Sequence, residues 1–192
     1  MKVWGITGGV GMGKSALTEL IRSRGVPVVD TDLLAHQLVQ PGQPALAEIQ
    51  SAFGSHLVDA TGQLCRSELA HIVFADASAR QKLEAILHPR IRSSWQAQLD
   101  AWRTEGRPAA VVVIPLLYET NAAPDFDAII CVACTGDTQQ QRLGQRGWTP
   151  EQIRQRQAAQ WPVPEKMALA DYVVWTEGAL ALLAAQLDRF FP

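Results

Sequence analysis

A glycine-rich segment near the start of the chain constrains its fold more than any other feature. Residues 8–15 read G-G-V-G-M-G-K-S and fit the pattern G-x-x-x-x-G-K-S. A short apolar run at 3–7 precedes the segment and suits a buried strand, and the apolar residues 17, 20 and 21 after it have helical spacing. A loop of this pattern between a strand and a helix is typical of sites that wrap phosphate groups.

The composition of the loop explains what it can bind. Glycine permits positive φ angles and keeps Cβ atoms away from an approaching polyphosphate. The N–H groups of the loop and of the first helical turn point at the anion, and the helix dipole assists them. Lys14 would reach the β- and γ-phosphates, and the hydroxyl of Ser15 would bind Mg²⁺. The sequence therefore predicts a site for a nucleoside triphosphate.

The rest of the chain predicts an α/β fold, because strand-like and helix-like segments alternate. The expected strands are short apolar runs at 26–30, 109–117, 129–133 and 172–175. The expected helices span 31–39, 44–53, 139–146, 151–160 and 179–190, and a helical block spans 66–103 with breaks near Asp76 and at His88-Pro89. This alternation predicts a parallel sheet with right-handed crossovers and helices on both faces. The ligand should lie beyond the carboxyl ends of the strands.

Charge and hydropathy argue against several kinds of partner. The formal net charge is -2, whereas general nucleic-acid binders have a basic face, so we expect no nucleic-acid partner. The chain has no apolar stretch of about 18 residues and no signal-like N-terminus, so we expect no membrane partner and a cytoplasmic location. The three cysteines agree with a reducing compartment, since an odd number cannot close into internal pairs. The C-x-x-C spacing of Cys131 and Cys134 is interpreted as packing within a strand.

Three classes of protein share such a loop: switch GTPases, motor or assembly ATPases, and small-molecule kinases. Residues 59–62 fit the D-x-x-G pattern of GTPases, but no apolar strand precedes them and an N-K-x-D guanine motif is absent, so we interpret them as a turn. The strand-like residues 111–114 lead into P-L-L-Y-E at 115–119 instead of ending in the acidic residue that a motor ATPase needs, and Glu119 is displaced from that position. The kinase class is therefore favoured.

Two acidic and two basic residues support the kinase hypothesis. Asp30 and Asp32 follow the second expected strand, where a carboxylate can accept the proton of an attacking hydroxyl or hold Mg²⁺-bound water; capping of the next helix is the alternative. Arg142 and Arg146 share one helix face, and a break at 147–150 follows them. They are typical of a mobile lid that closes on the transferred phosphoryl group, and a solvated basic face is the alternative.

Several segments occur in an order that resembles the dephospho-CoA kinase family. Besides the glycine-rich loop they are V-V-D-T-D at 28–32, H-P-R-I at 88–91, P-L-L-Y-E at 115–119, Arg142-x-x-x-Arg146, Arg156-x-x-x-Gln160 and A-D-Y-V-V at 170–174. The set spans nearly the whole chain. The segment G-Q-L-C-R at 62–66 also resembles the family, which usually has Asp or Asn where Cys65 stands.

The resemblance implies a reaction and a set of site residues. The reaction is transfer of the γ-phosphoryl group of ATP, with Mg²⁺, to the ribose 3′-hydroxyl of dephospho-CoA, the last step of coenzyme A biosynthesis. The implied catalytic residues are Lys14, Asp32, Asp30 and Arg142. The implied ATP-binding residues are Gly11, Met12, Gly13, Lys14, Ser15, Ala16 and Arg146, with Ser15 also the metal ligand. The implied acceptor-site residues are Asp32, Arg66, His88, Arg90, Leu116, Leu117 and Glu119.

The chain departs from the family pattern at three places. Met12 replaces a small polar residue and Ala16 replaces threonine, but both still contribute backbone N–H groups. Residues 175–178 replace an Asn-containing turn, which leaves the adenine contacts open. The alternatives are another P-loop nucleoside, nucleotide or small-molecule kinase, and a regulatory switch that binds a nucleotide without turnover.

The resemblance also implies how the chain is organised. We expect one P-loop kinase domain over 1–192, with a core like that of nucleoside monophosphate kinases. This core would comprise about 1–30, 105–135 and 168–192. A helical lobe over the acceptor site at 31–104 and a lid at 136–167 would complete the domain, because the helical block is too long for one crossover helix. We expect a monomer or weak homo-oligomer whose partner is the small molecule dephospho-CoA.

Overall fold

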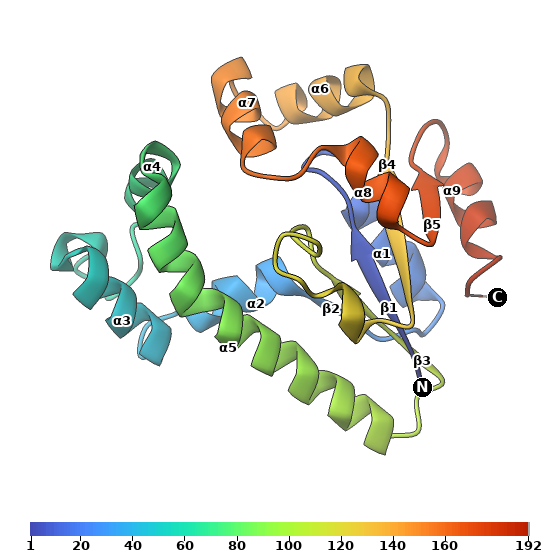
Figure 1. Ribbon diagram of the computed structural model, residues 1–192, viewed down its shortest axis with the longest axis horizontal. Coiled ribbons are helices and arrows are strands. Elements are labelled where there is room, and N and C mark those ends of the chain that lie inside the picture. Colours follow the sequence, from blue (N-terminus) through green and yellow to red (C-terminus); the bar gives the residue numbers. More distant parts are fainter. Residues whose placement is uncertain (192) are drawn as a thin grey trace. The chain divides into compact units, whose positions relative to one another are not determined.

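A computed structural model describes residues 1–191 of the chain (Figure 1). These residues form two compact units. One unit comprises residues 1–30 together with the chain from residue 99 onward, and the other comprises residues 31–98. No helix formed by residues 1–191 is both long and apolar enough to cross a bilayer.

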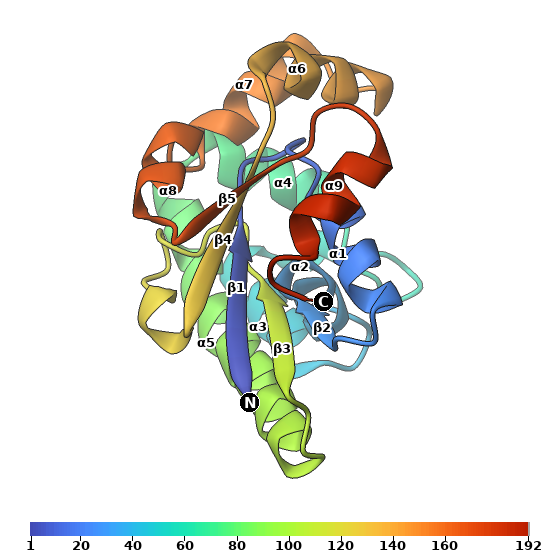
Figure 2. The same ribbon diagram turned by 90° about the vertical axis from the view of Figure 1, so that its right-hand side faces the viewer.

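The first unit is built on a five-stranded parallel sheet with the order β2-β3-β1-β4-β5 (Figure 2). The strands are β1 (Lys2–Thr7), β2 (Val28–Asp30), β3 (Ala109–Val113), β4 (Ala128–Ala133) and β5 (Tyr172–Trp175). The central strand β1 pairs with β3 on one side and β4 on the other, with Trp4 opposite both Val111 and Ala128. Because these strands are buried on both faces, their sequences are almost continuously apolar.

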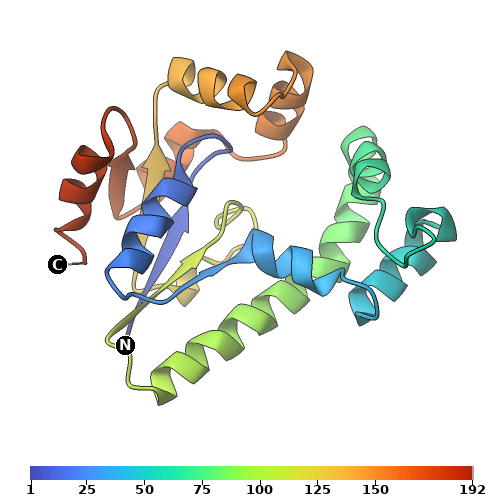
Figure 3. The same cartoon turned by 180° about the vertical axis from the view of Figure 1, so that it is seen from behind.

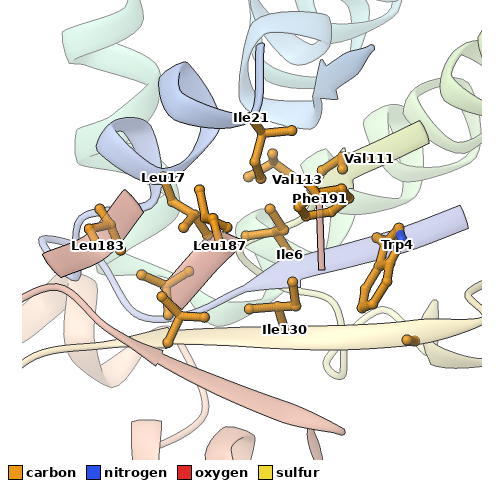
Figure 4. Packing of buried hydrophobic residues seen from close by; sticks show 13 residues of the cluster. Trp4, Ile6, Leu17, Ile21, Val111, Val113, Ile130, Leu183, Leu187 and Phe191 are labelled. Atoms are coloured by element: carbon orange, nitrogen blue, oxygen red, sulfur yellow. The ribbon is translucent and has the colours of Figure 1, made fainter. Parts of the chain in front are cut away.

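Two helices cover one face of the sheet. The helix α1 (Lys14–Ser23) contributes Leu17 and Ile21, and α9 (Leu180–Leu187) contributes Leu183 and Leu187. Figure 4 shows these four side chains pointing toward the strands, where Ile6 is fully buried. Full burial of a side chain of this size contributes roughly 1.5–3 kcal/mol. The cluster therefore fixes the position of α1, and with it the loop that precedes α1.

The other face of the sheet carries α8 (Val163–Leu169), which packs against β4 on the side opposite α1 (Figures 1 and 3). Helices α6 (Gly136–Gln145) and α7 (Pro150–Ala158) connect β4 to α8. Their starts are set by threonine caps: Thr135 accepts a hydrogen bond from the N–H of Thr138, and Thr149 forms a capping box with Gln152. Helices on both faces of a parallel sheet confirm the predicted fold class.

The second unit is helical. It contains α2 (Thr31–Leu38), α3 (Pro44–Phe53), the 3₁₀ turn Ser55–Leu57, α4 (Arg66–Ala75) and most of α5 (Ala77–Thr104). Its core is a separate apolar cluster: Val39, Ala45, Ile49, Leu57, Leu69, Val73 and Ile86. Since α5 runs from residue 77 to 104, its last turns belong to the first unit.

Among the predicted limits that are wrong, two involve proline. The helix break expected at His88-Pro89 does not occur, because α5 continues through Pro89. Proline in a helix costs about 3 kcal/mol, and the burial of Ile86 and Trp95 on either side of it offsets this cost by packing. The strand expected at 109–117 ends at Val113, two residues before Pro115, which has no N–H for the sheet.

Candidate active site

The glycine-rich loop adopts a conformation that requires glycine at several positions. Gly8, Gly11 and Gly13 have φ values of 139°, 77° and 90°. A Cβ atom on Gly8 would lie 2.3 Å from the carbonyl oxygen of Val132, and one on Gly13 would lie 2.7 Å from Oγ1 of Thr176. The loop thus lies against Val132 and Thr176, and at Gly8 and Gly13 only glycine fits without displacing these neighbours.

The side chain of Lys14 is held by main-chain atoms of the loop itself. Nζ of Lys14 donates hydrogen bonds to the carbonyl oxygens of Gly8 (2.7 Å) and Gly9 (2.9 Å). Gly13 begins α1 without a side-chain cap among the described residues, and Ser15 is exposed in the first turn. Helix N–H groups that no side chain caps are the ones that bind phosphate oxygens.

A second contact joins the loop to α6 and to the turn after β5. Arg142 donates through Nη1 to Oγ1 of Thr176 (2.8 Å) and through Nη2 to its carbonyl oxygen (2.5 Å). Oγ1 of Thr176 donates to the carbonyl oxygen of Met12 (2.8 Å). Arg142 therefore reaches the glycine-rich loop through one intervening side chain. Arg146, by contrast, is exposed at the C-terminal cap of α6.

Glu177 ties the same turn to the start of α6. Its carboxylate accepts hydrogen bonds from the N–H of Thr135 (2.6 Å) and the hydroxyl of Thr138 (2.9 Å). These bonds hold the pKa of Glu177 below its usual range, because they stabilise the charged form. The turn at 175–178 is thus fixed on both sides.

The segment after β3 is organised by a buried lysine. Lys166 on α8 is fully buried, and its Nζ donates to the carbonyl oxygen of Pro115 (2.6 Å) and pairs with Oε1 of Glu119 (2.7 Å). The same carboxylate oxygen accepts a hydrogen bond from the N–H of Trp161 (2.8 Å). Leu117 is fully buried, close to Gly5 of β1, and Leu116 is half-buried.

Two buried polar atoms on this segment have no hydrogen-bond partner among residues 1–191. They are Oη of Tyr118 and Oε2 of Glu119. Burial raises the pKa of Tyr118 to about 12, with smaller contributions from Cys131 and Asp171, so the phenol keeps its proton. Unsatisfied buried groups are uncommon and often mark places where a ligand completes the bonding.

Cys131 on β4 lies opposite Thr7, the last residue before the loop. It is fully buried, and burial raises the pKa of its thiol to about 11 against the opposing charges of Lys166 and Lys14. Cys134 is also buried, so both cysteines are packing residues as predicted.

The two candidate bases fall in different units. Asp30 ends β2, opposite Val113 of β3, at the carboxyl edge of the sheet from which the loop also leaves. Asp32 lies in the first turn of α2 and is exposed. Within the helical unit, Nη2 of Arg66 donates to the carbonyl oxygen of His36 (3.3 Å), which places Arg66 against the helix that carries Asp32.

The other two predicted residues of the helical unit lie on α5. Arg90 donates to the carbonyl oxygen of Ile86 (2.5 Å) and pairs with Glu48 of α3 (2.5 Å). His88 is half-buried, and burial lowers its pKa while Glu84 opposes that shift. Arg66 is thus brought to α2, whereas Arg90 is held by α3.

Sequence reasoning missed residues whose roles depend on distant partners. Lys166 stands in a short helix with no pattern that signals burial, and Thr176 stands in a turn that departs from the family. No local pattern marks Gln139 either, and Gln160 is marked only by the motif Arg156-x-x-x-Gln160. The contacts of these residues join positions far apart in the chain, which local patterns do not encode.

Comparisons with known proteins give the same assignment over the whole chain. The profile of the family described as dephospho-CoA kinase (CoaE) matches residues 2–181. The dephospho-CoA kinase of Anaeromyxobacter dehalogenans is 44% identical over 190 residues, covering 98% of this chain and 90% of the relative. The dephospho-CoA kinase of Thiobacillus denitrificans is 44% identical over 187 residues, covering 96% and 91%.

Solved structures agree with the fold. A crystal structure of a Thermus thermophilus protein superimposes with a TM-score of 0.84 at 32% identity, covering 98% of this chain and 95% of the other. Shikimate kinase from Acinetobacter baumannii shares the fold at a TM-score of 0.53 and 13% identity, covering 98% and 92%. With the glycine-rich loop intact and the family profile matched almost end to end, this chain belongs to the dephospho-CoA kinase family, and it is a kinase with ATP as the implied phosphoryl donor.

Proposed function

We propose that this protein transfers the γ-phosphoryl group of ATP to the ribose 3′-hydroxyl of dephospho-CoA, giving coenzyme A and ADP. The observation that carries the proposal is family membership over 98% of the chain together with an intact phosphate-binding loop. The reaction is the last step of coenzyme A biosynthesis, and we place it in the cytoplasm. We expect a monomer or weak homo-oligomer.

The donor would be held by the loop and the start of α1. The residues proposed for this role are Gly11, Met12, Gly13, Lys14, Ser15 and Ala16, mostly through backbone N–H groups. Lys14, already at the mouth of the loop, would exchange its bonds to loop carbonyls for bonds to phosphate oxygens. Arg142 and Arg146 of the proposed lid at 136–167 would add positive charge where negative charge develops.

Mg²⁺ fits this site by its donor chemistry. Ser15 offers an exposed hydroxyl beside Lys14, and hard oxygen ligands are those that Mg²⁺ prefers. Ser15 would hold the metal through its hydroxyl, and the metal would supply positive charge against the phosphate groups.

The acceptor hydroxyl would lose its proton to a carboxylate. We propose Asp32 as the base, with Asp30 close to it in the chain. General-base assistance of this kind is worth about 10²- to 10⁴-fold in rate. The remaining acceptor contacts are assigned to the proposed lobe at 31–104 and to the segment after β3. The residues are Arg66, His88, Arg90, Leu116, Leu117 and Glu119. The unpartnered oxygen of Glu119 supports its assignment, because it still has capacity for a hydrogen bond.

A coupled assay for ADP tests the proposal. Release of ADP from ATP should depend on added dephospho-CoA and should be far slower with a panel of nucleosides and nucleotides. Activity on another acceptor would instead identify a different P-loop kinase. Nucleotide binding without any acceptor-dependent ADP release would identify a regulatory switch.

A further inference from the structure

Two glutamine side chains bond the main-chain N–H and C=O of Val10 in the glycine-rich loop, and a third glutamine bonds one of these two. The N–H of Val10 donates to Oε1 of Gln160 (3.1 Å), and its carbonyl oxygen accepts from Nε2 of Gln139 (2.6 Å). Nε2 of Gln157 donates to Oε1 of Gln139 (2.8 Å). Gln139 lies on α6, Gln157 on α7 and Gln160 just after α7. We call Gln139, Gln157 and Gln160 the glutamine clamp.

The clamp has a defined polarity. Because Gln157 donates to the oxygen of Gln139, the amide nitrogen of Gln139 must face the carbonyl of Val10. Gln160 presents the opposite group, an oxygen, to the N–H. The two side chains therefore bond the two peptide planes that meet at the Cα of Val10, one through its N–H and the other through its carbonyl oxygen, which fixes the orientation of both planes.

The three glutamine side chains of the clamp are not enclosed by close packing on every side. They line a cavity of about 510 Å³, together with Trp161, Trp175 and other residues. Hydrogen bonds, and not close packing on every side, hold the amides where they are. Gln139 is itself buried, so a polar group left without a partner there is costly.

Val10 directly precedes the residues proposed to hold the phosphates of ATP. Its neighbour Gly11 has a positive φ, and a Cβ atom there would lie 2.9 Å from Cγ of Leu143 on α6. The carbonyl of Val10 shares its peptide plane with the N–H of Gly11, so a rotation of this plane would turn that N–H away from its present direction. Gln139 also precedes Arg142 by three residues, so one helix carries both the clamp and the arginine.

We propose that the glutamine clamp positions the loop for the donor nucleotide, with Gln139 and Gln160 as positioning residues. The inference rests on the proposed function only in naming ATP as that nucleotide. The clamp makes the affinity of the loop for ATP depend on the placement of α6 and α7. It acts on the donor and not on the acceptor, since both its targets are backbone atoms of the loop.

The first test replaces Gln139 with a side chain of the same shape. In Gln139→Glu the carboxylate cannot donate to the carbonyl of Val10 and repels it, so the KM for ATP should rise about tenfold at pH 8. The repulsion raises the pKa of the new carboxyl. Lowering the pH toward about 5 protonates it, restores a donor and should shrink the defect. The KM for dephospho-CoA should change little.

Gln140→Glu is the matched control, because Gln140 is exposed on the same helix and the charge change is identical. Equal effects in the two variants, a defect that does not depend on pH, or an equal rise in both KM values would overturn the proposal. Calorimetric titration with ATP, without any acceptor, gives the same comparison if dephospho-CoA proves not to be the substrate. The failure of the clamp and the failure of the proposed function are therefore distinguishable.

The second test uses the opposite polarity at Gln160. Gln160→Glu keeps an oxygen for the N–H of Val10, whereas Gln160→Met removes it. ATP binding should weaken about two- to tenfold in Gln160→Met and stay closer to wild type in Gln160→Glu. Equal binding by the two variants would contradict the inference even if Gln139→Glu fails to fold.

Discussion

Lys14 is bound to the carbonyl oxygens of its own loop, so its ammonium group is in place before any phosphate arrives. Removing it should lower turnover by about 10²- to 10³-fold, the usual effect of losing one donor to a developing negative charge. We therefore expect Lys14→Ala to keep its circular dichroism spectrum and to lose most of its activity. Lys2→Ala, at an exposed lysine on β1, is the control. A near-wild-type rate for Lys14→Ala would refute the assignment of the loop.

The choice between Asp30 and Asp32 can be made by kinetics. Asp32→Asn removes the proposed base and should lower kcat by about 10²- to 10⁴-fold, more than it changes the KM for the acceptor. Asp30→Asn should have a smaller effect on kcat. An effect of Asp32→Asn confined to KM would assign Asp32 to binding instead.

Gly13 offers a test of backbone conformation. Gly13→Ala forces a φ of 90° on alanine and places Cβ 2.7 Å from Thr176. The strain of about 1–2 kcal/mol, with the clash added, should raise the KM for ATP about tenfold or more. Gly25→Ala is the matched control, since its φ is 75° and nothing lies within 4 Å of its Cβ position. Both variants should lose stability, but a similar rise in KM in both would show that loop geometry is not the cause.

At the level of elements, α8 is anchored to the segment after β3 by an ion pair out of solvent. Lys166 is fully buried and the side chain of Glu119 is 15% exposed. Lys166→Met leaves Glu119 without its cation and should lower the free energy of unfolding by roughly 3–5 kcal/mol.

Urea denaturation measures this loss, and the double variant Lys166→Met/Glu119→Leu shows its origin. The double variant should be more stable than Lys166→Met, because no unpaired carboxylate is left. If the double variant is the less stable of the two, the pair is not the source of the loss.

The sequence predicted most elements but not all their limits. The apolar runs of β4 and β5 were visible because buried parallel strands contain few polar residues. The helix expected at 139–146 begins at Gly136, since Thr135 caps it three residues earlier than helical periodicity suggested. The helix α8 was missed, because seven residues with a central lysine give no amphipathic signal.

At the level of the whole molecule, the parallel sheet was predictable but its strand order was not. Strand β3 lies between β1 and β2, although more than seventy residues separate it from β2 in the chain. Such pairing depends on long-range packing that a local reading cannot reach. The same holds for the site. The phosphate-binding loop is predictable from its local pattern, whereas the contacts of Arg142 with Thr176 and of Lys166 with Glu119 are not, because the partners are far apart in the chain.

ATP binding should be visible in the stability of the whole protein. A ligand at 100 times its Kd stabilises the folded state by about 2.7 kcal/mol, which for a chain of this size raises Tm by about 5–10 °C. Differential scanning fluorimetry with and without ATP measures the shift, and Lys14→Ala should lose most of it. Equal shifts in the wild type and Lys14→Ala would mean that ATP binds elsewhere.

The thiol of Cys131 is buried in the sheet opposite Thr7, the residue that precedes the glycine-rich loop. This burial affects how the thiol reacts with oxidants in a cell. Peroxides and disulfides attack the thiolate, and a thiol with a pKa of about 11 supplies almost none at neutral pH. Cys131, which pairs with Thr7 in the sheet, is thereby shielded from oxidants.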